Sequence, residues 1–94
     1  MKPGAILVNT ARGGLVDEPA LVEALTSGHL RAAGLDVFAE EPLPVDSPLV
    51  GLDNVVLMPH VAWLTPETLD RSLAVAVENM RRLRDGGELL FRVV

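Results

Sequence analysis

A short, unbroken apolar run near the start of the chain limits the folds that are open to it. Residues 5–9 read Ala-Ile-Leu-Val-Asn and follow the turn-forming pair Pro3 and Gly4. A run of this length, rich in branched residues and bounded by a turn signal, predicts a strand that is buried on both faces. Such strands occur mostly in parallel sheets, whose neighbouring strands are joined by crossover connections.

Further strands and a helix follow this run in an alternating order. Asp17 suits the N-cap of a helix over about residues 18–27, and Gly28 suits its end. Residues 32–38, Ala-Ala-Gly-Leu-Asp-Val-Phe, are the candidate for a second strand, and residues 55–58 for a third. The chain therefore alternates strands with helical segments.

The last helix is the element that the sequence marks most clearly. Thr65 offers an N-cap, Pro66 suits the first helical position, and residues 85–87 (Asp-Gly-Gly) end the pattern. Between these signals, apolar residues recur at helical spacing and form one face. They are Leu69, Leu73, Ala76, Val77, Met80 and Leu83.

The order of these elements predicts an α/β fold, the second half of a doubly wound, Rossmann-like parallel sheet with about three strands and two main helices. Prolines and a glycine predict an irregular surface loop over residues 39–53. In such sheets, ligands bind beyond the carboxyl ends of the strands. Residues 10–14, 36–41 and 59–63 follow those ends, so we expect three loops remote in sequence to meet at one site.

The composition excludes several classes of function. The 94 residues suffice for one small domain, and 49% hydrophobic with 22% charged residues is typical of a packed chain. A net charge of -5 and the lack of a basic run argue against nucleic acid as a partner. We also expect no membrane span and no secretory signal, because no apolar run approaches the roughly 18 residues that a span needs.

The absence of cysteine narrows the chemistry further. With no Cys in the chain, disulfides, thiolate metal ligands and cysteine nucleophiles are all excluded, and we predict no metal site. This composition suits a reducing compartment, so the expected location is the cytoplasm.

Arg12 is the first candidate for a chemical role. It lies directly after the first predicted strand, in the segment Asn9-Thr10-Ala11-Arg12-Gly13-Gly14, whose glycines permit a tight approach of the backbone to a ligand. A guanidinium carries five donors in a fixed fork that suits bidentate capture of a carboxylate. Taken alone, an ordinary surface arginine beside a turn is the simpler interpretation.

Two acids and a histidine occupy the other strand ends. Asp36 and Glu41 could serve a polar ligand and orient a histidine, or could be two solvated loop acids. His60 directly follows the third predicted strand, whereas His29 is predicted to be an exposed residue at a helix end. Each residue alone favours a structural role, but the coincidence of Arg12, Glu41 and His60 at three strand ends favours a catalytic site.

Four ordered segments resemble the D-isomer-specific 2-hydroxyacid dehydrogenases, in the C-terminal half of their NAD-binding domain. They are residues 1–17, residues 34–42 with Gly-Leu-Asp-Val-Phe and Glu-Glu-Pro, residues 54–60, and the closing residues 87–94. Matches in this order are far more specific than a lone glycine motif. Trp63 resembles the glyoxylate and hydroxypyruvate reductase, glycerate dehydrogenase and C-terminal-binding-protein branches. Its alternative role is to fill the hinge before the last helix.

The resemblance implies a hydride transfer between NAD or NADP and a small 2-keto or 2-hydroxy acid. It implies that Arg12 binds the substrate carboxylate, that His60 exchanges the proton, and that Glu41 keeps His60 protonated for reduction. The implied cofactor contacts are Thr10, Ala11, Arg12, Asp36 and His60, and the implied substrate contacts are Arg12, His60 and Trp63. The family also implies a homodimer for the full-length enzyme.

Parts of that enzyme do not occur in these 94 residues. The G-x-G-x-x-G loop, the acidic residue for the adenosine ribose and the substrate-binding domain would precede Met1, which aligns with an internal Met of the family. We therefore expect a truncated gene, a misplaced start or a fragment that is inactive alone. The alternatives are a non-catalytic remnant that self-associates, and a different doubly wound domain with chance similarity.

The specific 2-hydroxyacid, the choice between NAD and NADP, and the oligomeric state stay open at this point. The residues that decide the first two would lie mostly upstream of Met1.

Overall fold

The computed structural model describes residues 1–93 and separates into two compact units. The first unit is Met1–Ala62, and the second begins at Trp63. The closing segment expected from the family resemblance ends at Val94, which lies outside the described residues. Each unit is described below by itself.

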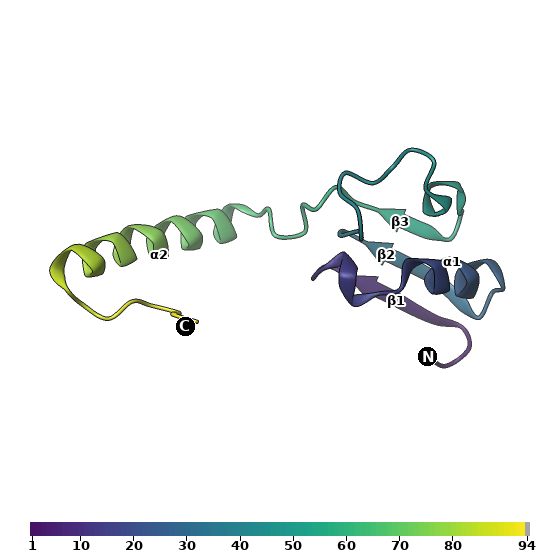
Figure 1. The fold of residues 1–94 in the computed structure, drawn as a ribbon, viewed down its shortest axis with the longest axis horizontal. Coiled ribbons are helices and arrows are strands. Elements are labelled where there is room, and N and C mark those ends of the chain that lie inside the picture. Colours follow the sequence, from purple (N-terminus) through teal and green to yellow (C-terminus); the bar gives the residue numbers. More distant parts are fainter. Residues whose placement is uncertain (94) are drawn as a thin grey trace. The chain divides into compact units, whose positions relative to one another are not determined.

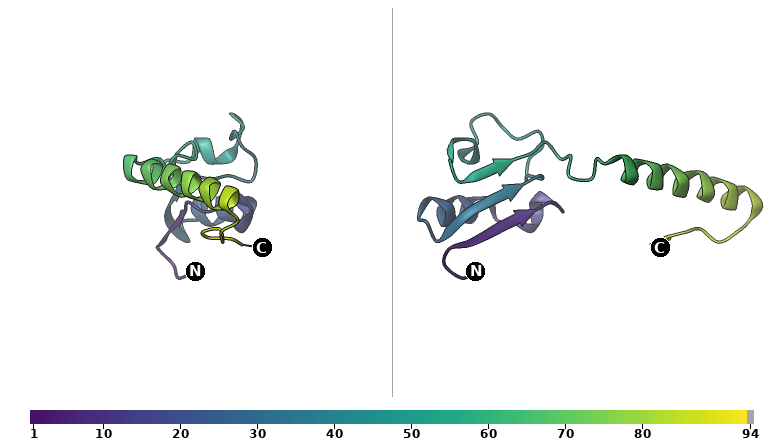
Figure 2. Two further views of the ribbon diagram at one scale, coloured as in Figure 1. Left: turned by 90° about the vertical axis from the view of Figure 1, so that its left-hand side faces the viewer. Right: turned by 180° about the vertical axis from the view of Figure 1, so that it is seen from behind.

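A three-stranded parallel sheet forms the framework of the first unit. Its strands are β1 (Ala5–Asn9), β2 (Leu30–Leu35) and β3 (Val55–Leu57), in the spatial order β1-β2-β3. Figure 2 shows that all three run in the same direction. Asn9 pairs with Leu35, and Leu35 pairs with Leu57, so the carboxyl ends of the strands lie at one edge of the sheet. The predicted α/β fold with parallel strands is confirmed.

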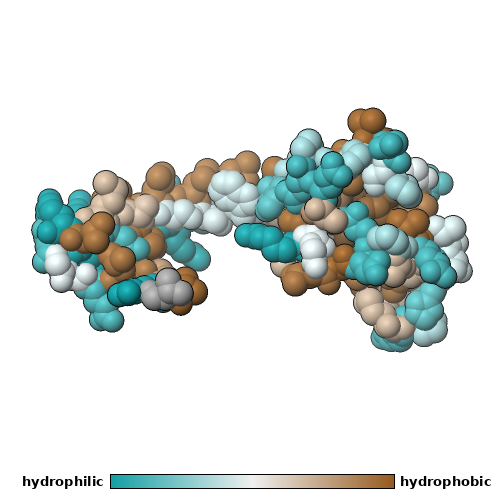
Figure 3. All heavy atoms as spheres, viewed as in Figure 1, coloured by the Kyte–Doolittle hydropathy of each residue, from teal (hydrophilic) through white to brown (hydrophobic). Residues whose placement is uncertain are grey.

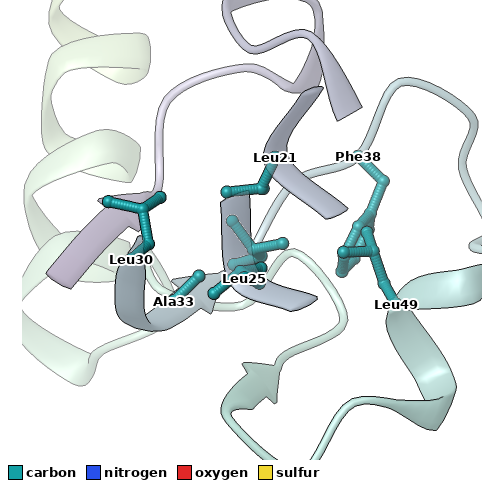
Figure 4. Packing of buried hydrophobic residues seen from close by; sticks show 7 residues of the cluster. Leu21, Leu25, Leu30, Ala33, Phe38 and Leu49 are labelled. Carbon is teal, nitrogen blue, oxygen red and sulfur yellow. The ribbon is translucent and has the colours of Figure 1, made fainter. Parts of the chain in front are cut away.

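Helix α1 (Glu18–Thr26) lies beside the sheet in Figure 1 and supplies much of its core. Asp17 caps the helix as expected, because its side chain accepts a hydrogen bond from the Ala20 amide. Figure 4 shows the buried side chains of α1 packed with those of β2 and of the loop that follows it. The cluster consists of Leu21, Leu25, Leu30, Ala33, Leu35, Phe38 and Leu49.

The prediction that β1 is buried on both faces is wrong. Ile6 and Val8 are 49% and 69% exposed, and Val56 of β3 is exposed on the same pattern of alternation. Successive side chains of a strand point to opposite faces of a sheet. The core cluster lies on only one of these faces, so the other face of the first unit carries exposed apolar side chains.

The boundaries of β2 and β3 also differ from those expected. β2 begins at Leu30 and ends at Leu35, whereas the sequence favoured residues 32–38, and β3 ends at Leu57, one residue early. β2 ends before Asp36, whose amide still donates to the Asn9 carbonyl and whose side chain accepts from two amides of another loop. The expected loop over residues 39–53 is confirmed, although it contains the 3-10 turn η2 (Pro48–Gly51), whose Leu49 is fully buried.

The second unit is dominated by α2 (Pro66–Asp85), which follows the predicted bounds. Thr65 caps its start through the Thr68 amide, and Gly86, with φ of 71°, caps its end in the left-handed conformation. None of its residues is buried, and apolar side chains, brown in Figure 3, stand along its surface. Neither α2 nor any other helix within residues 1–93 is long and apolar enough to cross a membrane.

Candidate functional site

The loop that carries Arg12 is shaped by the last residue of β1. Asn9 is buried, and its side-chain oxygen accepts from the Ala11 amide at 3.1 Å while its Nδ2 donates to the Arg12 carbonyl at 2.8 Å. Arg12 then precedes the 3-10 turn η1 (Gly13–Leu15) and donates from Nη1 to the Ala11 carbonyl at 2.6 Å. Asn9 is not among the residues predicted from the sequence, although an Asn at a strand end before a turn is typical of a side chain that bonds to its own loop.

Gly13 brings this loop against the loop after β2. A β-carbon at Gly13 would overlap the main-chain carbonyl of Phe38, whereas one at Gly14 would meet open space. The sequence predicted that both glycines permit a tight approach to a ligand. In the structure, Gly13 instead permits a tight approach to the backbone of another loop.

Glu41 and His60 are in direct contact at the centre of the site. Glu41 Oε2 lies 2.8 Å from His60 Nδ1, and Glu41 Oε1 accepts from the Phe38 amide at 3.0 Å. The side chains are 37% and 41% exposed, so the pair is reachable from solvent. The Glu41 pKa is lowered by the hydrogen bond from His60, then by the Phe38 amide, with smaller contributions from the charges of His60 and Arg12.

His60 owes its position to the loop that follows β3. Its backbone is left-handed, with φ of 57°, a conformation that is uncommon outside glycine. The next two amides, those of Val61 and Ala62, donate to the two carboxylate oxygens of Asp36 at 2.8 and 2.9 Å. Asp36 is only 4% exposed, so the interpretation of this residue as a solvated loop acid is wrong. It holds the loop that presents His60.

Two hollows flank these loops. One, of about 370 Å³, is lined by apolar side chains together with Glu41 and His60. The other, of about 200 Å³, has Thr10 and Asp36 among otherwise apolar or glycine residues. The latter are Val8, Gly34, Leu35, Val56, Met58, Val61 and Ala62.

The structure thus brings most of the predicted residues to one edge of the sheet. Glu41 and His60 are in direct contact, and Arg12 lies close enough for its charge to lower the Glu41 pKa. Thr10 and Asp36 share the smaller hollow. Ala11 lies in the turn between Thr10 and Arg12, and its amide is bonded to Asn9. Trp63 belongs to the second unit and is half exposed.

The lowered Glu41 pKa leads to a prediction about pH. Because the folded pKa is depressed, the contact with His60 contributes stability above the ordinary Glu pKa of about 4.3, and this is lost as the pH falls through the folded value. Replacing His60 with Ala is expected to raise the Glu41 pKa, as followed by carbon NMR of the Glu41 carboxyl group. The Asp85 pKa, lowered by Arg84, serves as the control and should not change. An unchanged Glu41 titration would contradict the assigned pair.

Comparisons with known proteins show the family of the chain. The family model described as "D-isomer specific 2-hydroxyacid dehydrogenase, NAD binding domain" matches residues 1–62. The glyoxylate/hydroxypyruvate reductase B of Pectobacterium atrosepticum is 59% identical over 80 residues, which cover 85% of this chain and 25% of that protein. The chain spans about a quarter of the length of the curated relatives that it matches.

Solved structures give the same result. A D-isomer-specific 2-hydroxyacid dehydrogenase from Xanthobacter autotrophicus in complex with NADPH and MES is 47% identical, with a TM-score of 0.86 over 100% of this chain and 38% of that one. An NADPH-dependent glyoxylate/hydroxypyruvate reductase from Sinorhizobium meliloti, in complex with citrate, is 42% identical, with a TM-score of 0.83 over 95% and 28% of the two chains. The likeness extends from sequence to fold.

Proposed function

Because the chain belongs to the D-isomer-specific 2-hydroxyacid dehydrogenase family, we propose that it is the catalytic half of the nucleotide-binding domain of a glyoxylate/hydroxypyruvate reductase. The observation that carries the proposal is the 2.8 Å contact between His60 and Glu41 at the carboxyl edge of a parallel sheet, with Arg12 on the neighbouring loop. The family resemblance inferred from the sequence is therefore confirmed, and the activity follows from it as a proposal.

His60 is the proton donor in this proposal. Reduction of a 2-keto acid adds a hydride to the carbonyl carbon and a proton to its oxygen, and a bound nicotinamide supplies the hydride. Glu41 holds Nδ1 of His60, so the proton passes from Nε2 to the substrate oxygen. In the oxidative direction the same nitrogen accepts the proton. The Glu41 carboxylate orients the imidazole in both directions.

Arg12 supplies the positive charge that a carboxylate substrate requires. Its guanidinium is bonded to the Ala11 carbonyl in the present structure, and two parallel N–H groups suit a bidentate contact with a carboxylate. A cation at this point also stabilises the charge that develops on the keto oxygen during hydride transfer. Arg12 therefore combines substrate binding with transition-state stabilisation.

The smaller hollow fits the nicotinamide end of NAD or NADP. Its apolar walls suit a flat ring, and Thr10 and Asp36 place polar groups among them. The 94 residues contain no G-x-G-x-x-G sequence, so the contacts to the pyrophosphate would have to come from residues outside them. The contact of Trp63 with substrate and the homodimer stay predictions from the resemblance, and the cytoplasmic location stays a prediction from the absence of cysteine.

A chimaera tests the proposal. The aligned 80 residues of the Pectobacterium atrosepticum reductase are replaced with those of this chain, which are 59% identical. We expect this chimaera to oxidise NADPH in the presence of glyoxylate or hydroxypyruvate, and the 94-residue chain alone to show no turnover, because the rest of the enzyme is needed to hold both reactants. A folded but inactive chimaera would favour a non-catalytic remnant, and turnover by the chain alone would show that these residues suffice.

A further inference from the structure

We propose that Asn9 is a positioning residue that sets the grip of Arg12 on the substrate carboxylate, an inference that rests on the proposed function. Asn9 ends β1 and is 8% exposed, although it is polar. A buried amide is retained at low cost only where its donor and acceptor groups are bonded. Both groups of Asn9 are bonded to the loop that carries Arg12, namely to the Ala11 amide and the Arg12 carbonyl.

Several contacts hold the loop after β1 in place at Arg12. The Arg12 carbonyl accepts from Asn9 Nδ2 at 2.8 Å and from the Leu15 amide at 3.3 Å. The next residue, Gly13, lies against the Phe38 carbonyl with no room for a side chain. Asn9 is itself held to the sheet, because its own carbonyl accepts from the Asp36 amide at 3.0 Å. The Asn9 side chain therefore fixes the position of the Arg12 main chain relative to β1 and to the end of β2.

The same hydrogen bonds also restrict the position of the Arg12 side chain. Its guanidinium donates to the Ala11 carbonyl, which belongs to the same turn that the Asn9 side chain closes. A misplacement of a substrate-binding group by about 1 Å can lower the rate of a reaction by about 100-fold. Loss of the Asn9 contacts should thus weaken the binding of substrate while the Glu41 and His60 contact, which does not involve Asn9, persists.

The chain offers a matched control in Asn54. Its side chain also makes two hydrogen bonds to the main chain, because its Nδ2 donates to the carbonyls of Leu25 and Arg31 at 3.2 and 3.4 Å. Asn54 precedes β3, whereas Asn9 ends β1, so the two amides serve opposite edges of a parallel sheet. The same substitution at both positions separates an effect on Arg12 from a general loss of amide hydrogen bonds.

The test compares Asn9→Ser and Asn54→Ser in the active chimaera. For Asn9→Ser we expect the KM for glyoxylate to rise and kcat to fall, so that kcat/KM decreases about 10- to 100-fold, with an unchanged pH profile of kcat/KM. In an Arg12→Lys background, Asn9→Ser should cause little further change in kcat/KM, because both substitutions weaken the same contact between Arg12 and the substrate carboxylate. Asn54→Ser should leave KM unchanged. A KM that does not move in Asn9→Ser, or that moves equally in Asn54→Ser, overturns the inference.

A second measurement keeps the inference separate from the proposed function. In the 94-residue chain, the heteronuclear NOE of the Arg12 Nε–H group reports the mobility of its side chain. We expect it to fall in Asn9→Ser but not in Asn54→Ser, whether or not the chimaera is active. If Asn9→Ser does not fold, Asn9→Asp, which keeps the side-chain volume and the acceptor for Ala11, replaces it in both experiments. An unchanged NOE in the folded Asn9 variant counts against the inference, whereas an inactive parent chimaera counts against the proposed function alone.

Discussion

Replacing His60 with Gln in the active chimaera is expected to lower kcat for glyoxylate reduction by about 100- to 10,000-fold, the range that a general acid contributes. Gln retains a polar side chain but cannot deliver a proton as an imidazolium does. The side chain is 41% exposed and belongs to a surface loop, so the thermal unfolding temperature should change little. Steady-state kinetics with NADPH and a thermal melt of the same preparation measure both quantities.

His29 provides the control for this experiment. It is the other histidine of the chain, is exposed, and bonds through Nε2 to the Met1 carbonyl. His29→Gln should leave kcat within about twofold of the parent, since surface substitutions away from a site have small effects. Near-normal kinetics in His60→Gln, or equal losses in the two variants, would remove His60 from the mechanism.

Replacing Gly13 with Ala is expected to destabilise the first unit by about 3 kcal/mol, at the upper end of the usual range for overpacking. The added β-carbon would overlap the Phe38 carbonyl, which is main chain and cannot rotate away. One of the two loops must therefore move. The adjacent Gly14→Ala meets no atom within 4 Å, and its effect should stay within about 0.5 kcal/mol.

Urea unfolding of the 94-residue chain measures the two free energies side by side. The pair differs by one position in the sequence and shares the same chemical change, so helix and loop propensities largely cancel. Equal stabilities for Gly13→Ala and Gly14→Ala would mean that the loops carrying Arg12 and Phe38 are not packed together as the structure shows. The expected difference in unfolding free energy would show that the loops carrying Arg12 and Phe38 are packed against each other.

Arg12, Glu41 and His60 could be selected from the sequence because each follows a predicted strand end. The parallel topology then brings such ends together, and the expected α/β fold is confirmed. Asn9 could not be selected in the same way, because a strand-final Asn reveals neither its burial nor which of its neighbours it will bond. From the sequence, Asp36 could be a partner of a ligand or a solvated acid, and only the structure shows that its oxygens accept from the amides of a loop 25 residues away.

The sequence by itself determined the order of strands and helices and the ends of both helices. These features depend on interactions among residues a few positions apart, such as the Asp17 and Thr65 caps and the left-handed Gly86. Only the tertiary structure decided which face of β1 stays exposed, that Leu49 closes the core, and that Gly13 meets Phe38. Those contacts join segments that are remote in the chain, and they arise only once the sheet has set the register of its strands.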